Sequence, residues 1–205
     1  MENNTQLKEM IRSMVIDILQ GQKQEMASSQ PIKQAPRGQV EPGVFDTVDE
    51  AIQAAKAAQA RFEDCTLATR EKVIADIRAA MRPRVQELAQ KTVDETGMGR
   101  VADKVLKLNL TLNKTPGVED LVTECETGDN GMTLYELSAY GVIGAITPST
   151  NPAETLICNS IGMLAAGNAI FFSVHPGAKN LSRELVSELN QVIAKSIGIE
   201  NLIVT

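Results

Sequence analysis

The chain has 205 residues, of which 43% are hydrophobic and 22% charged, a composition typical of a globular protein. Its net charge of −6 without a basic cluster argues against nucleic acid as a partner, and no apolar run approaches the roughly 20 residues that span a bilayer. Cys65, Cys125 and Cys158 are too far apart for a disulfide framework or a metal knuckle. We therefore expect no metal site, no membrane contact and a reducing cytoplasm.

The first 20 residues predict an amphipathic helix. Its apolar stripe, at helical spacing, consists of Leu7, Met10, Ile11, Met14, Val15, Ile18 and Leu19. Residues 21–43 are rich in Gln, Ser, Pro and Gly, which predicts a flexible linker. The helix therefore docks either on a partner or back on its own domain.

The folded domain is predicted over residues 44–205, and its first part reads as helical. Thr47 and Glu50 form a capping box before an alanine-rich helix. A second helical region over 68–95 should be kinked or divided at Pro83, and Gly97 should end it. A further helix is expected over 101–113.

The second part reads as a β-hairpin near 131–141, after an Asp-Asn-Gly turn signal, followed by a βαβαβ unit from 142. Strands are predicted at 142–146, 169–173 and 202–205, with helices at 153–166 and 178–196. This order indicates an α/β fold with a parallel sheet and helices on both faces. Ligands of such sheets lie beyond the carboxyl ends of the strands, so the loops 147–152 and 175–177 should lie side by side.

The first of these loops, Thr-Pro-Ser-Thr-Asn-Pro, allows two interpretations. Its hydroxyl and amide groups, with the positive end of the following helix, could bind an anion or a developing oxyanion. Alternatively, Ser149, Thr150 or Asn151 merely caps that helix. His175 is as consistent with ligand contact as with a structural role, and Cys158 is expected to be a buried small side chain.

Gly141-Val-Ile-Gly144 is not a dinucleotide fingerprint, and Gly167-Asn168 is interpreted as a helix C-cap. Five segments together nevertheless resemble one family: "ETGMGR", "TPGVEDL", "TGDNGMTLYE", "GVIGAITPSTNPAETLICNSIGMLAAGN" and "SVHPGAK". This combination resembles the CoA-acylating aldehyde dehydrogenases of bacterial microcompartments, from about Gly43 to Thr205. The resemblance implies an aldehyde-dehydrogenase-like cofactor domain with a parallel Rossmann-type sheet, incomplete at the C-terminus.

By the same resemblance, NAD and coenzyme A are the expected cofactors and a short-chain aldehyde the substrate. Asn151 would donate to the oxyanion, with Thr150 as the alternative, because an ungapped alignment places Thr150 at the asparagine of the superfamily's Pro-Trp-Asn. The superfamily's Lys-Pro-x-Glu is replaced here by Ser-Val-His-Pro. The residues expected to contact cofactor are Thr147, Pro148, Ser149, Ser173, His175, Pro176 and Lys179, the last of which is otherwise an ordinary solvated helix residue.

The family's nucleophilic cysteine lies in a second domain, so the resemblance implies that these 205 residues are the N-terminal part of an enzyme and inactive alone. It also implies that the N-terminal helix is an encapsulation peptide, which binds shell proteins or co-encapsulated enzymes in the microcompartment lumen. A homo-oligomer is expected. The alternative is a non-catalytic cargo or assembly module derived from a truncated aldehyde dehydrogenase.

Overall fold

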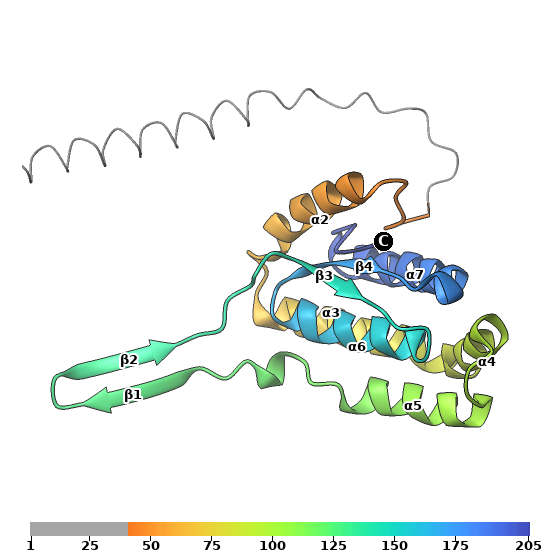
Figure 1. Cartoon of the computed structure of the whole chain (residues 1–205). Coiled ribbons are helices and arrows are strands. Elements are labelled where there is room, and N and C mark those ends of the chain that lie inside the picture. Colours follow the sequence, from red (N-terminus) through yellow and green to blue (C-terminus); the bar gives the residue numbers. More distant parts are fainter. Residues whose placement is uncertain (1–40) are drawn as a thin grey trace, which may run out of the picture. The chain divides into compact units, whose positions relative to one another are not determined.

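The computed structural model describes residues 41–205 (Figure 1), so the helix predicted over 1–20 and the linker predicted over 21–40 lie outside the described residues. The last residues of the predicted linker already belong to the fold, and that boundary was wrong. Gly43 is buried, its carbonyl accepts a hydrogen bond from Thr205 N (2.9 Å), and Phe45 N donates to Thr205 O (3.0 Å). Gly43 has φ +77°, and a Cβ there would lie 2.6 Å from Ile203 O. Glycine is therefore the residue that fits this close approach.

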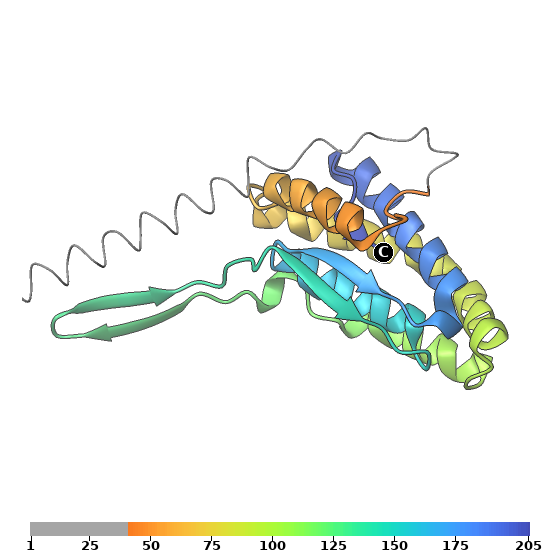
Figure 2. The ribbon, with the colours of Figure 1, turned by 45° about the horizontal axis from the view of Figure 1, so that its top comes forward.

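The centre of the fold is a parallel sheet of three strands in the order β3 (Val142–Ile146), β4 (Ala169–Ser173) and β5 (Ile203–Val204). Helix α2 (Val48–Phe62) crosses one face of this sheet, while α6 (Pro152–Ala165) and α7 (Lys179–Ile197) cover the other (Figures 1 and 2). The predicted βαβαβ order and the helices on both faces are confirmed. Only β5 is shorter than the predicted strand.

The helical first part also follows the sequence signals. Thr47 Oγ1 accepts from Glu50 N (3.3 Å) at the start of α2, as the capping box predicted. Pro83 lies in a 3₁₀ turn, η1 (Arg82–Arg84), which separates α3 (Leu67–Met81) from α4 (Val85–Thr96). Gly97 ends α4 with φ +65°, and α5 (Val101–Lys114) follows.

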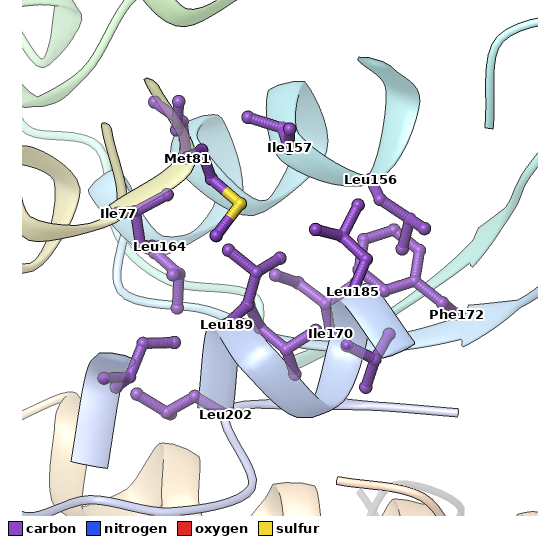
Figure 3. Close-up of a cluster of buried hydrophobic side chains, with 14 of the residues drawn as sticks. Ile77, Met81, Leu156, Ile157, Leu164, Ile170, Phe172, Leu185, Leu189 and Leu202 are labelled. Atoms are coloured by element: carbon purple, nitrogen blue, oxygen red, sulfur yellow. The ribbon is translucent and has the colours of Figure 1, made fainter. Parts of the chain in front are cut away.

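The main core lies between α3, α6, α7 and the sheet (Figure 3). Its fully buried side chains include Ile77, Met81, Leu156, Ile157, Leu164, Ile170, Phe172, Leu185, Leu189 and Leu202. The turn from α6 to β4 is fixed by Gly167, with φ +82°, and by Asn168. Asn168 Oδ1 accepts from Tyr140 N (2.6 Å) and Gly141 N (3.1 Å), so the predicted C-cap also anchors the start of β3.

A β-hairpin is present, but its predicted position was partly wrong. It consists of β1 (Glu124–Gly128) and β2 (Gly131–Tyr135), paired antiparallel, with every residue of both strands exposed. The turn Asp129-Asn130 lies at its centre, whereas the prediction placed both strands after the turn. The sequence of β1, Glu-Cys-Glu-Thr-Gly, carries no apolar alternation that would mark a strand. Figures 1 and 2 show the hairpin extending away from the sheet, and a 3₁₀ turn, η2 (Val118–Asp120), lies between α5 and β1.

An ion-pair network joins α4 to α7. Arg84 contacts Glu87 (2.7 Å), Glu184 (2.7 Å) and Glu188, and Lys91 contacts Glu184 (2.6 Å). The hydrogen bond from the Arg84 guanidinium, aided by Lys91, lowers the pKa of Glu87 to about 2. At neutral pH Glu87 is therefore charged, and the contacts of Arg84 and Lys91 with Glu184 tie the two helices together.

Candidate active site

The loops after β3 and β4 meet at the carboxyl edge of the sheet, as predicted. Ile146, the last residue of β3, is paired with Ser173, the last residue of β4, and Thr147 N donates to Ser173 O (3.1 Å). The residues 147–151 and 173–176 therefore begin from adjacent positions. This is the edge at which parallel α/β sheets bind their ligands.

Asn151 occupies the N-cap position of α6, but its side chain makes no capping hydrogen bond. Neither Ser149 nor Thr150 supplies one, so the interpretation of this loop as a side-chain cap was wrong. Pro152 at the first helical position has no N–H to offer. The backbone N–H groups of the next two residues are left without a side-chain cap, and the positive end of the helix dipole faces the loop.

The side chain of Asn151 is held by α5 instead. Its Oδ1 accepts from Lys104 Nζ (3.0 Å) and from Lys107 Nζ (3.2 Å). Lys104 Nζ also donates to the carbonyl oxygen of Thr150 and lies 3.6 Å from Glu154 Oε1. Lys104 is 3% exposed and Glu154 7% exposed, so this is a buried ion pair directly beneath the loop.

The first cofactor candidates differ in their surroundings. Thr147 is 2% exposed and its Oγ1 has no hydrogen-bond partner within residues 41–205. Pro148 and Ser173 are exposed, and Ser149 is half-buried with its Oγ 3.7 Å from Met98 Sδ. Next to them Ile146 is 86% exposed, which is unusual for a strand residue of a parallel sheet. An exposed apolar side chain beside hydroxyl groups and an open helix N-terminus fits a ligand with a flat apolar part and an anionic part.

The candidates after β4 are arranged differently. His175 Nδ1 accepts from Gly177 N (3.0 Å) and caps a 3₁₀ turn, η3 (Pro176–Ala178), so this exposed histidine has a structural role in the described chain. Pro176 and Lys179 are exposed. The N-terminus of α7 is closed, because Glu95 on α4 accepts from Asn180 N (2.8 Å) and Leu181 N (2.8 Å).

The three cysteines are free thiols, and the expectation for one of them was wrong. Cys158 is exposed, whereas Leu156, Ile157 and Ile161 of the same helix are buried. Helix α6 is apolar on nearly all sides, so its composition suggested burial for a residue whose position on the helix faces outward. Within the described range 41–205 no three His, Cys, Asp or Glu side chains are arranged to hold a metal ion, and no helix is long and apolar enough to cross a membrane.

The sequence analysis missed Lys104, Lys107 and Glu154. A signal for Lys104 exists, because it falls in register with Val101, Leu108 and Leu112 on the inner stripe of α5. A lysine on an apolar stripe must find a buried partner, but the sequence alone does not say which one.

Comparison with known proteins places this site in context. The aldehyde dehydrogenase family model matches residues 18–192. The chain is 45% identical over 203 residues to a propanal dehydrogenase (CoA-propanoylating) of Salmonella typhimurium, covering 99% of this chain and 42% of that protein. It thus spans less than half the length of this relative.

Two solved structures are also similar. One is an engineered glycolyl-CoA reductase with bound NADP+, with a TM-score of 0.78 and 47% identity over 82% of this chain and 38% of that one. The other is a propionaldehyde dehydrogenase from the fucose utilisation bacterial microcompartment of Clostridium phytofermentans, with a TM-score of 0.77 and 46% identity over 80% of this chain and 38% of that one.

Proposed function

The chain belongs to the aldehyde dehydrogenase family, and we propose that it is the N-terminal part of an NAD-dependent enzyme that converts a short-chain aldehyde to its acyl-CoA. The similarity to a CoA-propanoylating propanal dehydrogenase over 203 of the 205 residues carries this proposal. The open N-terminus of α6 at the carboxyl edge of the sheet supports it, because acyl transfer needs donors for a developing oxyanion.

Asn151 is the proposed oxyanion donor, and Thr150 is the alternative. Loss of one such donor typically costs about 100- to 1,000-fold in kcat. Thr147, Pro148, Ser149 and Ser173 line the proposed cofactor side, with His175, Pro176 and Lys179 farther along. When bound, NAD would supply the hydride acceptor and coenzyme A the acyl acceptor. The residues of this chain orient the aldehyde carbonyl and stabilise the negative charge that develops on its oxygen.

We propose that the enzyme works in a bacterial microcompartment and that residues 1–20 bind shell proteins or co-encapsulated enzymes. The origin of a similar propionaldehyde dehydrogenase in a microcompartment supports the location. The alignment with the Salmonella protein covers 99% of this chain, so it extends into the residues before the folded domain. Exposed Met132, Leu134 and Tyr135 on β2 support a homo-oligomer, because apolar side chains on a projecting hairpin favour association.

The first test is to measure the intact mass of the natively expressed protein and then assay the same sample for CoA-dependent NADH formation from propionaldehyde. A mass well above that of 205 residues, with activity, is the expected result. A mass equal to that of the 205-residue chain, without activity, would favour the non-catalytic assembly module.

The donor assignment is tested in the active protein with Asn151→Ala and Thr150→Ala. We expect about 100-fold or greater loss of kcat for Asn151→Ala and less than about 10-fold loss for Thr150→Ala. If Thr150→Ala instead caused the larger loss of kcat, Thr150 rather than Asn151 would be the donor. Deleting residues 1–20 should leave kcat unchanged and abolish co-purification with shells, and retained encapsulation would contradict the role of this segment.

A further inference from the structure

We propose that Lys104, paired with Glu154, is the positioning residue that fixes the side chain of Asn151 so that its amide nitrogen points to the reacting carbonyl. This inference rests on the proposed function, since it concerns the proposed oxyanion donor. It adds two residues to that site: Lys104 of α5, which is distant from Asn151 in the sequence, and Glu154 in the first turn of α6.

The chemistry of lysine determines which way the amide faces. An ammonium group has three donors and no lone pair, so the atom of Asn151 that faces Lys104 at 3.0 Å must be the oxygen Oδ1. The same argument applies to Lys107 at 3.2 Å. With Oδ1 occupied by two lysines, Nδ2 lies on the other side of the amide and makes no hydrogen bond within residues 41–205. Its N–H groups are free for a ligand.

Lys104 has two hydrogen bonds and one charge partner at this site. Its Nζ donates to the carbonyl oxygen of Thr150 and to Oδ1 of Asn151, and Oε1 of Glu154 lies 3.6 Å away as the opposite charge. Lys104 therefore holds the backbone before Asn151 and the side chain of Asn151 at the same time. The same ammonium group thus restrains both the backbone next to Asn151 and the orientation of its amide.

Burial of this ion pair costs desolvation free energy, so a contribution to stability does not by itself explain it. Lys104 and Glu154 are 3% and 7% exposed, and neither oxygen of Glu154 accepts a hydrogen bond in the described chain. A buried ion pair seldom stabilises more than a well-packed apolar pair would. Its position at the first turn of α6, three residues after Asn151, favours a role in holding that residue. The ammonium also polarises the amide, which strengthens Nδ2 as a donor.

The arrangement favours Asn151 over Thr150 as the donor. The carbonyl oxygen of Thr150 is occupied by Lys104, and its side chain is exposed without a described hydrogen bond. Asn151 is half-buried, and its side chain is restrained at one end and free at the other. A preorganised donor of this kind is what oxyanion stabilisation requires.

The test is a double-mutant cycle on kcat in the complete enzyme that carries this chain, with Lys104→Met, Asn151→Ala and both together. We expect Lys104→Met alone to lower kcat about 10- to 100-fold with little change in the aldehyde KM, because a misdirected donor keeps part of its effect. In the Asn151→Ala background, Lys104→Met should lower kcat by less than about 3-fold, since the group through which it acts is gone. Equal effects in both backgrounds would overturn the proposal.

Lys114→Met is the matched control, because Lys114 is an exposed lysine at the far end of the same helix. It should leave kcat unchanged. If Lys104→Met alone does not fold, the double variant Lys104→Met/Glu154→Leu replaces the pair by apolar side chains and should fold. It should show the same loss of kcat, and normal kcat in this variant would overturn the proposal.

A crystal structure of Lys104→Met gives a readout that does not depend on activity. The amide of Asn151 should turn away from its position in the unchanged protein. An unaltered Asn151 would overturn the positioning role, even in an active enzyme. If instead the unchanged enzyme forms no NADH from aldehyde and CoA while the Asn151 amide turns as expected, the proposed function fails and the structural part of this inference stands.

Discussion

The carboxylate of Glu95 gives a sharp prediction, because it caps a helix to which it does not belong. Helix α7 begins after Ala178, which has no side-chain acceptor for the free N–H groups of the first turn. Glu95, in the last turn of α4, accepts from Asn180 N and Leu181 N at 2.8 Å each. These are the second and third residues of α7, whose N–H groups an ordinary capping side chain would satisfy.

Replacing Glu95 by Ala removes both bonds and a negative charge at the positive end of α7. Loss of a cap costs about 0.5–2 kcal/mol, and the charge contributes about 0.3–1 kcal/mol. Glu95 also lies at the C-terminus of α4, where its charge is unfavourable by a few tenths of a kcal/mol. The net expectation is a loss of about 1–2 kcal/mol in the free energy of unfolding.

The assay is urea unfolding followed by circular dichroism. With a slope of about 2 kcal/mol/M, the midpoint of Glu95→Ala should fall by about 0.5–1 M without a change in slope. Glu95→Gln keeps one acceptor, so its urea midpoint should lie between the midpoints of Glu95→Ala and of the unchanged protein. Asp94→Ala removes the neighbouring charge without touching α7 and should change stability by less than about 0.5 kcal/mol. A midpoint for Glu95→Ala equal to that of Asp94→Ala would refute the reasoning.

Urea unfolding also tests the contributions to stability of backbone conformation, steric contact, core packing and an ion pair. Gly97→Ala should cost about 1–2 kcal/mol, because φ is +65° and no atom lies within 4 Å of the new Cβ. Gly43→Ala should cost about 3 kcal/mol or more, since its Cβ would also collide with the backbone. Equal losses of stability for Gly97→Ala and Gly43→Ala would contradict a separate contribution from this collision. Leu189→Ala, at a fully buried site, should cost about 2–5 kcal/mol, and a smaller loss would mean that the core closes around the gap. Because the hydrogen bond with Arg84 lowers the pKa of Glu87 from 4.5 to about 2, the stability that Glu87 contributes is present above pH 4.5 and lost as pH falls towards 2. Glu87 is about half exposed, so Glu87→Gln should cost about 0.5–1 kcal/mol at pH 7 and nothing near pH 2, and a cost independent of pH would exclude the ion pair as its source.

The elements that could be predicted from the sequence are those with local signals. Apolar runs bounded by turn residues marked β3 and β4, and Thr47, Pro83 and Gly97 marked helix boundaries within a few residues. The hairpin was displaced because β1 is polar and exposed, so it buries nothing that would leave a pattern. The exposure of Cys158 was missed for the opposite reason. Helix α6 carries apolar residues on its outer face as well, so its pattern did not distinguish inside from outside.

The site was predictable only in part, because some of its contacts follow from the order of elements and others depend on how distant helices pack. Adjacent positions on parallel strands bring the loop at Thr147 next to Ser173, and the order of elements alone predicts this. Lys104 is 47 residues from Asn151, and no local rule connects a lysine on one helix to an amide at the start of another. Such a contact follows from how α5 packs on α6, which a single sequence does not specify.

Helices α6 and α7 each follow a strand of the sheet, but the surroundings of their N-termini differ in charge. At α7 the missing cap is supplied by Glu95, whose charge opposes the approach of an anion, so any phosphate contact there must come from the side chain of Lys179 rather than from the helix dipole. At α6 the residue in the cap position is held by Lys104 and Lys107, which leaves the N–H groups of the first turn without a side-chain cap. Glu154 offsets the charge of Lys104, and Lys107 adds a further positive charge. Negative charge is therefore favoured at the end of β3 and opposed at the start of α7. This asymmetry, to which contacts from α4 and α5 contribute, supports the proposal that a developing oxyanion is bound at the loop of Asn151.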